Sequence, residues 1–89
     1  MQEKNTKPHN LILDNRKNLS LSGIEDVPVF NEETVRLKTA MGDLIVKGSS
    51  LHINRLDLDS GEVEIEGVIN LLSYLENKSD KSFLQRLLG

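Results

Sequence analysis

The 89-residue chain contains no cysteine, and its aromatic residues are limited to Phe30, Tyr74 and Phe83. Without thiols it can build neither a disulfide framework nor a thiolate zinc site, a composition that suits a reducing compartment. Three scattered aromatic rings give no stacking platform for unpaired bases, so binding of single-stranded nucleic acid is disfavoured. The core must therefore be built from leucine, isoleucine and valine.

Excess positive charge and long apolar runs are also missing. The net charge is −3 and the basic residues are scattered, so the basic stripe of a nucleic-acid binder is absent. The apolar runs fall far short of the roughly 20 residues of a membrane-spanning helix. Residues 1–8 are polar throughout and lack the apolar stretch of a signal peptide. We expect a cytoplasmic protein without a transmembrane segment and without a nucleic-acid partner.

What is present is enough for one small globular domain. A hydrophobic content of 37% with 28% charged residues is ordinary for a folded soluble chain. A domain of this length buries a modest share of its surface, so self-association is an expected supplement to its stability. A homo-oligomer is therefore one expected partner state.

Apolar residues alternate with polar ones from Leu11 to about Leu72, which indicates β-strands, and we place the β domain at residues 10–76. Residues 1–9 lack such a pattern and are predicted to form a flexible arm. Turn residues recur at short intervals in the β domain. We predict an all-β fold, a small antiparallel roll, barrel or sandwich of six to seven short strands. A short β-solenoid-like stack is the alternative.

Several segments can be placed within this pattern. Residues 11–13 and 19–22 indicate a first hairpin, and residues 34–38 and 44–46 a second. Pro28 cannot donate to a ladder, so its extended segment should lie at an edge.

The second half of the pattern is less regular. The Gly48-Ser49-Ser50 stretch interrupts it, and a phase shift at Asn54 and Arg55 indicates a bulge. Residues 59–62 form the clearest turn, and the dense apolar run 68–72 indicates a central strand.

Residues 77–89 are predicted to form a polar linker and a short amphipathic C-terminal helix. The apolar stripe of this helix consists of Phe83, Leu84, Leu87 and Leu88. Such a short helix is marginal in water unless it docks on a surface. That surface is the β domain itself, another copy or partner, or a membrane.

Charged residues gather on two predicted strand faces. Glu62, Glu64 and Glu66 share one face, and Arg36 and Lys38 share another. A paired-carboxylate site needs two contrasting environments, so a solvated strand face is the favoured interpretation. The basic face is expected to pair with the glutamates, either within the fold or between copies.

Other polar residues suggest neither metal binding nor catalysis. Asp57, Asp59 and Gly61 resemble the start of a calcium loop, but the remaining ligands and flanking helices are lacking, so a hairpin turn is favoured. His9 and His52 have no neighbouring ligands. We predict no catalytic, cofactor-binding or metal-binding residues. The nine residues of the tail stripe and the two charged faces are the candidate interaction residues.

Three stretches and the tail carry a family resemblance. They are LDNRKNLSLSG at 13–23, GDLIVKG at 42–48, LHINRLDLDSGEVEIEG at 51–67 and, more weakly, FLQRLL at 83–88. Through them the chain resembles the YabP/YqfC family of endospore-forming bacteria over almost its full length. The third stretch is the most distinctive.

This resemblance implies a sporulation protein of the mother-cell compartment, peripheral at the forespore surface. It also implies a membrane-protein partner of the YabQ type, a contribution to the spore envelope, and no catalytic site. We therefore expect a non-enzymatic protein that acts in spore envelope assembly or morphogenesis through protein–protein interaction. A small ligand-binding or enzymatic β-barrel is the alternative.

Overall fold

A computed structural model describes residues 8–75, and every regular element in this range is a β-strand. The strands form one antiparallel sheet with the order β1-β2-β6-β5-β4-β3. The all-β antiparallel prediction is confirmed. The predicted helix and linker of residues 77–89 lie outside the described residues. The strands are β1 (Asn10–Asp14), β2 (Asn18–Ser22), β3 (Ile24–Phe30), β4 (Thr34–Thr39), β5 (Gly42–Asp57) and β6 (Glu62–Leu75).

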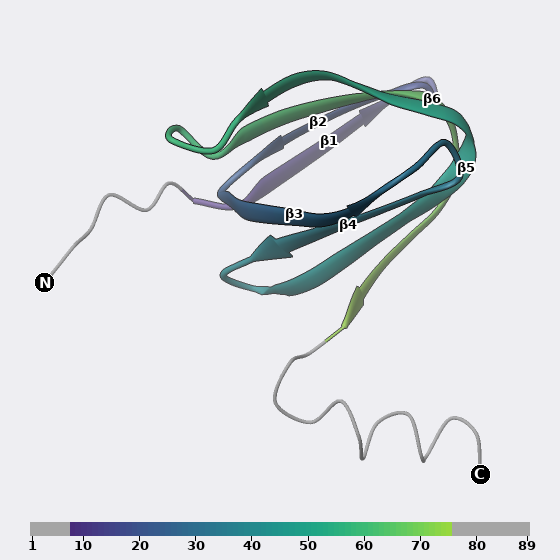
Figure 1. The fold of residues 1–89 in the computed structure, drawn as a ribbon. Helices are drawn as coiled ribbons and strands as arrows, with labels where there is room; N and C mark the ends of the chain where they lie inside the picture. Colours follow the sequence, from purple (N-terminus) through teal and green to yellow (C-terminus); the bar gives the residue numbers. More distant parts are fainter. Residues whose placement is uncertain (1–7, 76–89) are drawn as a thin grey trace, which may run out of the picture.

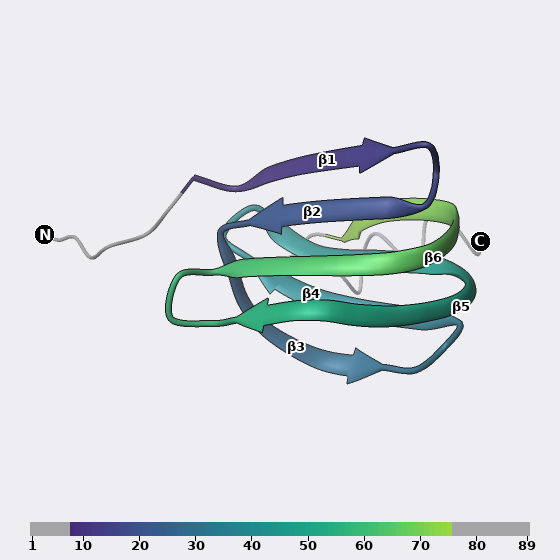
Figure 2. The same ribbon diagram turned by 90° about the horizontal axis from the view of Figure 1, so that it is seen from above.

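The sheet folds back on itself into a roll (Figure 1). Strands β5 and β6 are 16 and 14 residues long, and both bend so that each contributes to two layers. The end of β5 and the start of β6 lie with β1 and β2 in one layer, and the start of β5 lies with β4 and β3 in the other (Figures 1 and 2). The sequence pattern had suggested separate short strands here, because a bend with a change of register interrupts alternation just as a turn does.

Two glycines make the bend possible. A Cβ atom on Gly48 would lie 1.8 Å from the carbonyl oxygen of Val68, and one on Gly67 would lie 2.7 Å from that of Ser50. Gly67 also has a φ of 144°, a conformation that side-chain-bearing residues rarely adopt. The register of β5 against β6 shifts on both sides of this point, between Lys47 and Gly48 and between Ser49 and His52. The two backbones therefore approach more closely here than any other residue would allow.

The β1–β2 turn and the β3–β4 turn satisfy backbone groups at the bend. In β6, the N–H groups of Gly67 and Ile69 donate to the carbonyl oxygens of Lys17 and Arg16, at 3.1 and 2.9 Å. In β5, those of Gly48 and Leu51 donate to Glu33 and Glu32, at 3.1 and 2.9 Å. Buried backbone groups need such partners. The bend thus donates hydrogen bonds to the β1–β2 turn on one side and to the β3–β4 turn on the other.

The core lies between the two layers and consists of aliphatic side chains. Alternate residues of β2, β4, β5 and β6 point inward, as the period of two predicted. Eleven residues form the buried cluster: Leu19, Leu21, Ile24, Val35, Leu37, Leu44, Val46, Leu51, Val63, Ile65 and Ile69.

Most of the local predictions are confirmed. Both hairpins form, Pro28 lies on edge strand β3, and β6 is internal in the sheet order. The bulge appears as a register shift between Ile53 and Arg55. The β1–β2 turn places Asn15 and Arg16 at φ values of 55° and 54°, and the N–H of Lys17 donates to the carbonyl oxygen of Asp14 at 3.0 Å.

His9 was predicted to belong to the N-terminal arm, but it is held against the roll. Its Nδ1 lies 2.9 Å from the carbonyl oxygen of Ser22, and its Nε2 is hydrogen-bonded to the hydroxyl of Tyr74. The two rings are also in edge-to-face contact, with their centroids 5.6 Å apart. His9, the residue before β1, is therefore tied to Tyr74 near the end of β6. Alternation does not reveal such a long-range contact.

Candidate interaction surfaces

The three glutamates lie on the outer face of the first half of β6, and side chains of β5 contact Glu62 and Glu66. Glu66 Oε1 accepts hydrogen bonds from Asn54 at 3.2 Å and from His52 at 3.1 Å. The amide hydrogen bond, followed by that of the imidazole, lowers the pKa of Glu66. Glu62 forms an ion pair with Arg55 at 3.1 Å. These contacts fit the predicted solvated strand face.

Arg36 and Lys38 lie on β4. Within the fold Arg36 binds Asp43 and not one of the glutamates with which pairing was predicted. Its Nε and Nη2 donate to Asp43 Oδ2 at 3.0 and 2.7 Å. Instead of pairing with a glutamate of β6, Arg36 thus binds a carboxylate on the adjacent strand, because β5 lies between β4 and β6. Asp43 is buried, and its Oδ1 has no hydrogen-bond partner. This pair could not be predicted from the sequence, since alternation alone does not distinguish a buried aspartate from a turn residue.

The loop that resembles a calcium site is a turn closed by its own side chain. Asp57 Oδ1 accepts from the N–H groups of Asp59 and Ser60, at 3.1 and 3.2 Å. The hydrogen bond from the Ser60 backbone is the largest effect that lowers the pKa of Asp57. The predicted turn is confirmed. Among residues 8–75, no group of three or more histidine, aspartate or glutamate side chains is arranged to hold a metal ion.

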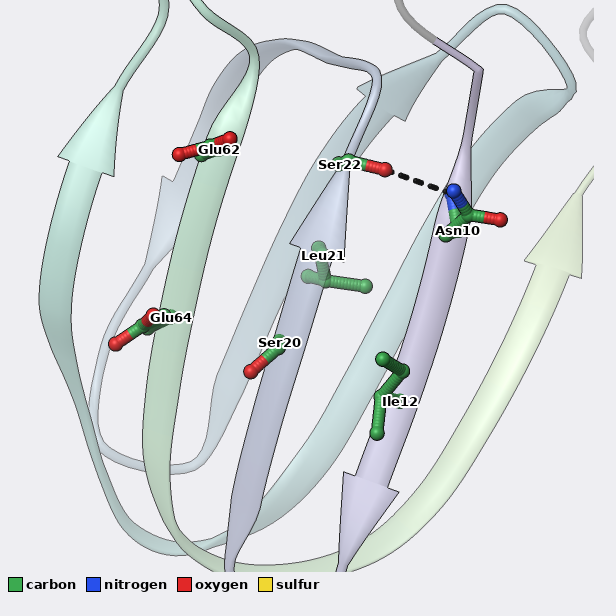
Figure 3. A pocket seen from close by; sticks show the side chains of 7 residues that line it. All are labelled: Asn10, Ile12, Ser20, Leu21, Ser22, Glu62 and Glu64. Carbon is green, nitrogen blue, oxygen red and sulfur yellow. Dashed lines mark hydrogen bonds between the residues drawn. The ribbon is translucent and has the colours of Figure 1, made fainter.

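An open groove of about 310 Å³ runs over the outer face where β1, β2 and β6 lie side by side (Figure 3). The Ser22 hydroxyl in its wall is already engaged, since it accepts from the N–H of Asn10 at 3.1 Å and donates to the carbonyl oxygen of Pro8 at 2.8 Å. Ile12 projects from β1 and is 64% exposed. The lining mixes carboxylate, hydroxyl, amide and aliphatic groups: Asn10, Ile12, Ser20, Leu21, Ser22, Glu62 and Glu64.

The polar groups of this lining are spread over an open face. Glu64 and Ser20 are exposed and share a cross-strand pair. A catalytic pocket would bring polar groups together away from water. Glu62 and Glu64 were predicted as interaction residues from the sequence, whereas Ile12 was not; its side chain lies on the outer face of β1, between the half-buried Leu11 and Leu13. The tail residues Phe83, Leu84, Leu87 and Leu88 lie outside the described residues.

The fold and these surfaces define a small antiparallel β-roll with solvated outer faces. Residues 5–81 match the YabP family, so the chain belongs to that family. The chain is also 39% identical over 75 residues to the spore protein YabP of Bacillus subtilis (strain 168), a match covering 83% of this chain and 75% of that protein. The resemblance seen in the sequence is confirmed. Within residues 8–75 no helix is long and apolar enough to cross a membrane.

Proposed function

We propose that this chain is a non-enzymatic sporulation protein that acts in spore envelope assembly or morphogenesis through protein–protein contacts. The observation that carries the proposal is its 39% identity, over most of its length, to a spore protein. Family membership across residues 5–81 supports the same conclusion.

The character of the surface supports an interaction role. Large apolar side chains are exposed on several strands and one turn, including Ile12, Phe30, Met41 and Leu71. Exposed apolar groups bordered by polar ones are typical of protein contact surfaces. The inside of the roll is filled by fully buried aliphatic side chains, so a ligand-binding barrel of the alternative type would have to use the outer groove.

The compartment and partner in this proposal come from the family resemblance. The protein acts in the mother cell, at the forespore surface, beside a membrane protein of the YabQ type. The apolar tail stripe of Phe83, Leu84, Leu87 and Leu88 supplies the docking element, since a short amphipathic helix gains its stability from the surface that it covers. Arg36, Lys38 and the three glutamates are secondary contact residues.

Co-sedimentation with vesicles tests this role. Purified full-length protein is mixed with vesicles that contain the organism's YabQ-type protein and, separately, with protein-free vesicles of the same lipids. We expect binding to the first and not to the second, and loss of binding in a Leu84→Ser/Leu87→Ser variant. Equal binding to both would replace the protein partner by a lipid surface, and binding to neither would refute this partner.

The enzyme or ligand-binding alternative has its own test. A small molecule held in the groove between β1, β2 and β6 would raise the melting temperature by mass action. A Ser20→Trp substitution would fill the groove without touching the core, because Ser20 is exposed. A metabolite that stabilises the parent protein and not this variant would favour the alternative over the assembly role.

A further inference from the structure

The two edge strands of the sheet differ in how open they are to another strand. At one end, β3 carries Pro28, the charged Glu25 and Asp26, and two register shifts against β4. These features are typical of an edge that resists pairing. At the other end, β1 pairs with β2 in unbroken register over all five of its residues, and its sequence Asn-Leu-Ile-Leu-Asp has no proline (Figure 2). The open edge of the molecule is therefore β1.

Hydrogen bonds at both ends of β1 show which backbone groups face outward. The carbonyl oxygen of Asp14 accepts from the N–H of Lys17, and the N–H of Asn10 donates to Ser22 Oγ, so both groups point toward β2. In an antiparallel strand successive residues point their N–H and C=O groups to alternate sides. Ile12 therefore shares the direction of Asn10 and Asp14. The N–H and C=O groups of Leu11 and Leu13 point to the open edge.

We propose that β1 pairs antiparallel with β1 of a second copy, about a two-fold axis through Ile12. In this register Leu11 of each copy lies opposite Leu13 of the other, and both pairs exchange their outward backbone hydrogen bonds. The two Ile12 residues then form the central non-hydrogen-bonded pair, in which cross-strand side chains lie closest. Five residues of each strand are paired, and none of the outward groups is left without a partner.

The side chains fit the same register. Ile12 is 64% exposed in one copy and would pack against its counterpart on the outer face. Leu11 and Leu13 are half-buried against the core and would extend the apolar layer into the second copy. Asn10 of one copy faces Asp14 of the other, so an amide donor meets a carboxylate and no two like charges are opposed. A strand that is its own complement in charge and shape favours a second copy over a different protein as the occupant.

This contact deepens the proposed assembly role and rests on it for its biological purpose. A two-fold contact uses the same surface on both copies, so it closes as a dimer and leaves the rest of each surface free for other partners. Its paired length is short, which predicts a weak contact with a Kd between about 1 µM and 1 mM.

Charged substitutions at the two-fold position test the proposal by sedimentation equilibrium of the full chain. Ile12→Lys and Ile12→Glu each place like charges directly opposite, and we expect each to weaken dimerisation at least about tenfold. A 1:1 mixture of the two variants should recover dimers, because lysine then faces glutamate. Met41→Lys is the matched control: Met41 is 69% exposed in the β4–β5 turn, and β2 and β6 lie between β1 and β5 in the sheet, so its substitution should leave the dimer intact.

A disulfide test gives an independent readout. The chain has no cysteine, so each single substitution introduces one thiol. Non-hydrogen-bonded pairs have Cα atoms about 4.5 Å apart, within the range that a disulfide spans. On mild oxidation, Ile12→Cys protein should form covalent dimers much faster than Met41→Cys protein. A parent chain that stays monomeric at millimolar concentration, or equal rates for the two cysteine variants, would overturn the β1 contact while leaving vesicle binding, and so the proposed function, untouched.

Discussion

Replacing Gly48 by alanine should destabilise the roll more than its small size suggests. The added Cβ would lie 1.8 Å from the carbonyl oxygen of Val68, while real Cβ contacts are essentially never below 3.0 Å. The obstacle is backbone, so β5 and β6 must separate by more than about 1 Å at the bend, which strains the Gly48 hydrogen bond to Glu33. Overpacking of this kind costs about 3 kcal/mol or more. For a domain of this size that lowers the melting temperature by roughly 12 °C or more.

Urea unfolding followed by circular dichroism measures this loss, with Ser49→Ala as the control. Ser49 neighbours Gly48 in the bend and is exposed, so its variant should stay within about 0.5 kcal/mol of the parent protein. A Gly48→Ala protein within about 1 kcal/mol of the parent would show that the two strands do not approach as described, and would refute the bent-strand account of the roll.

Three further predictions concern polar contacts. Arg36→Leu leaves the buried carboxylate of Asp43 without its ion-pair partner and should lower the free energy of unfolding by about 1–3 kcal/mol. Arg36→Leu/Asp43→Leu should recover part of that loss. A double variant no more stable than the single one would exclude this pairing. Because the turn lowers the pKa of Asp57, the ionised carboxylate stabilises the fold above its ordinary pKa, and this stabilisation is lost as the pH falls through the lowered value. Asp57→Asn should therefore make the melting temperature less sensitive to acid. An unchanged dependence of the melting temperature on acid pH would count against the turn hydrogen bonds. Burial raises the pKa of Tyr74, the only tyrosine in the chain, so the absorbance change of its phenol group should occur above pH 10.0. The free energy of unfolding should fall as the pH rises past that value, and this fall should be absent in Tyr74→Phe.

Local patterns predicted much of the fold because alternation and turn chemistry are written in neighbouring residues. The two hairpins, the edge position of Pro28 and the Asp57 turn depend on contacts close in sequence. The bend could not be predicted in the same way. Gly48 of β5 is required because the backbone of β6 lies against it, and Gly67 of β6 is required because the backbone of β5 does. In the sequence alone, each glycine suggested a break in the strand.

The candidate surfaces show the same division. That the glutamates share one solvated face follows from a period of two, and the structure places them so. The choice of Asp43 as the partner of Arg36 depends on which strands are neighbours, and strand order is a long-range property. The link from His9 to Tyr74 spans 65 residues and has no local signal. The open edge at β1 likewise follows only once the sheet order is known.

The location of the protein in sporulating cells tests the central claim most directly. A fluorescent fusion of the full chain is followed through sporulation in its own host, with the Leu84→Ser/Leu87→Ser variant beside it. The account predicts that fluorescence gathers around the forespore on its mother-cell side, and that the tail variant spreads through the mother cell. Fluorescence that stays diffuse for the parent chain, or that arises mainly inside the forespore, would contradict an assembly role at the spore envelope.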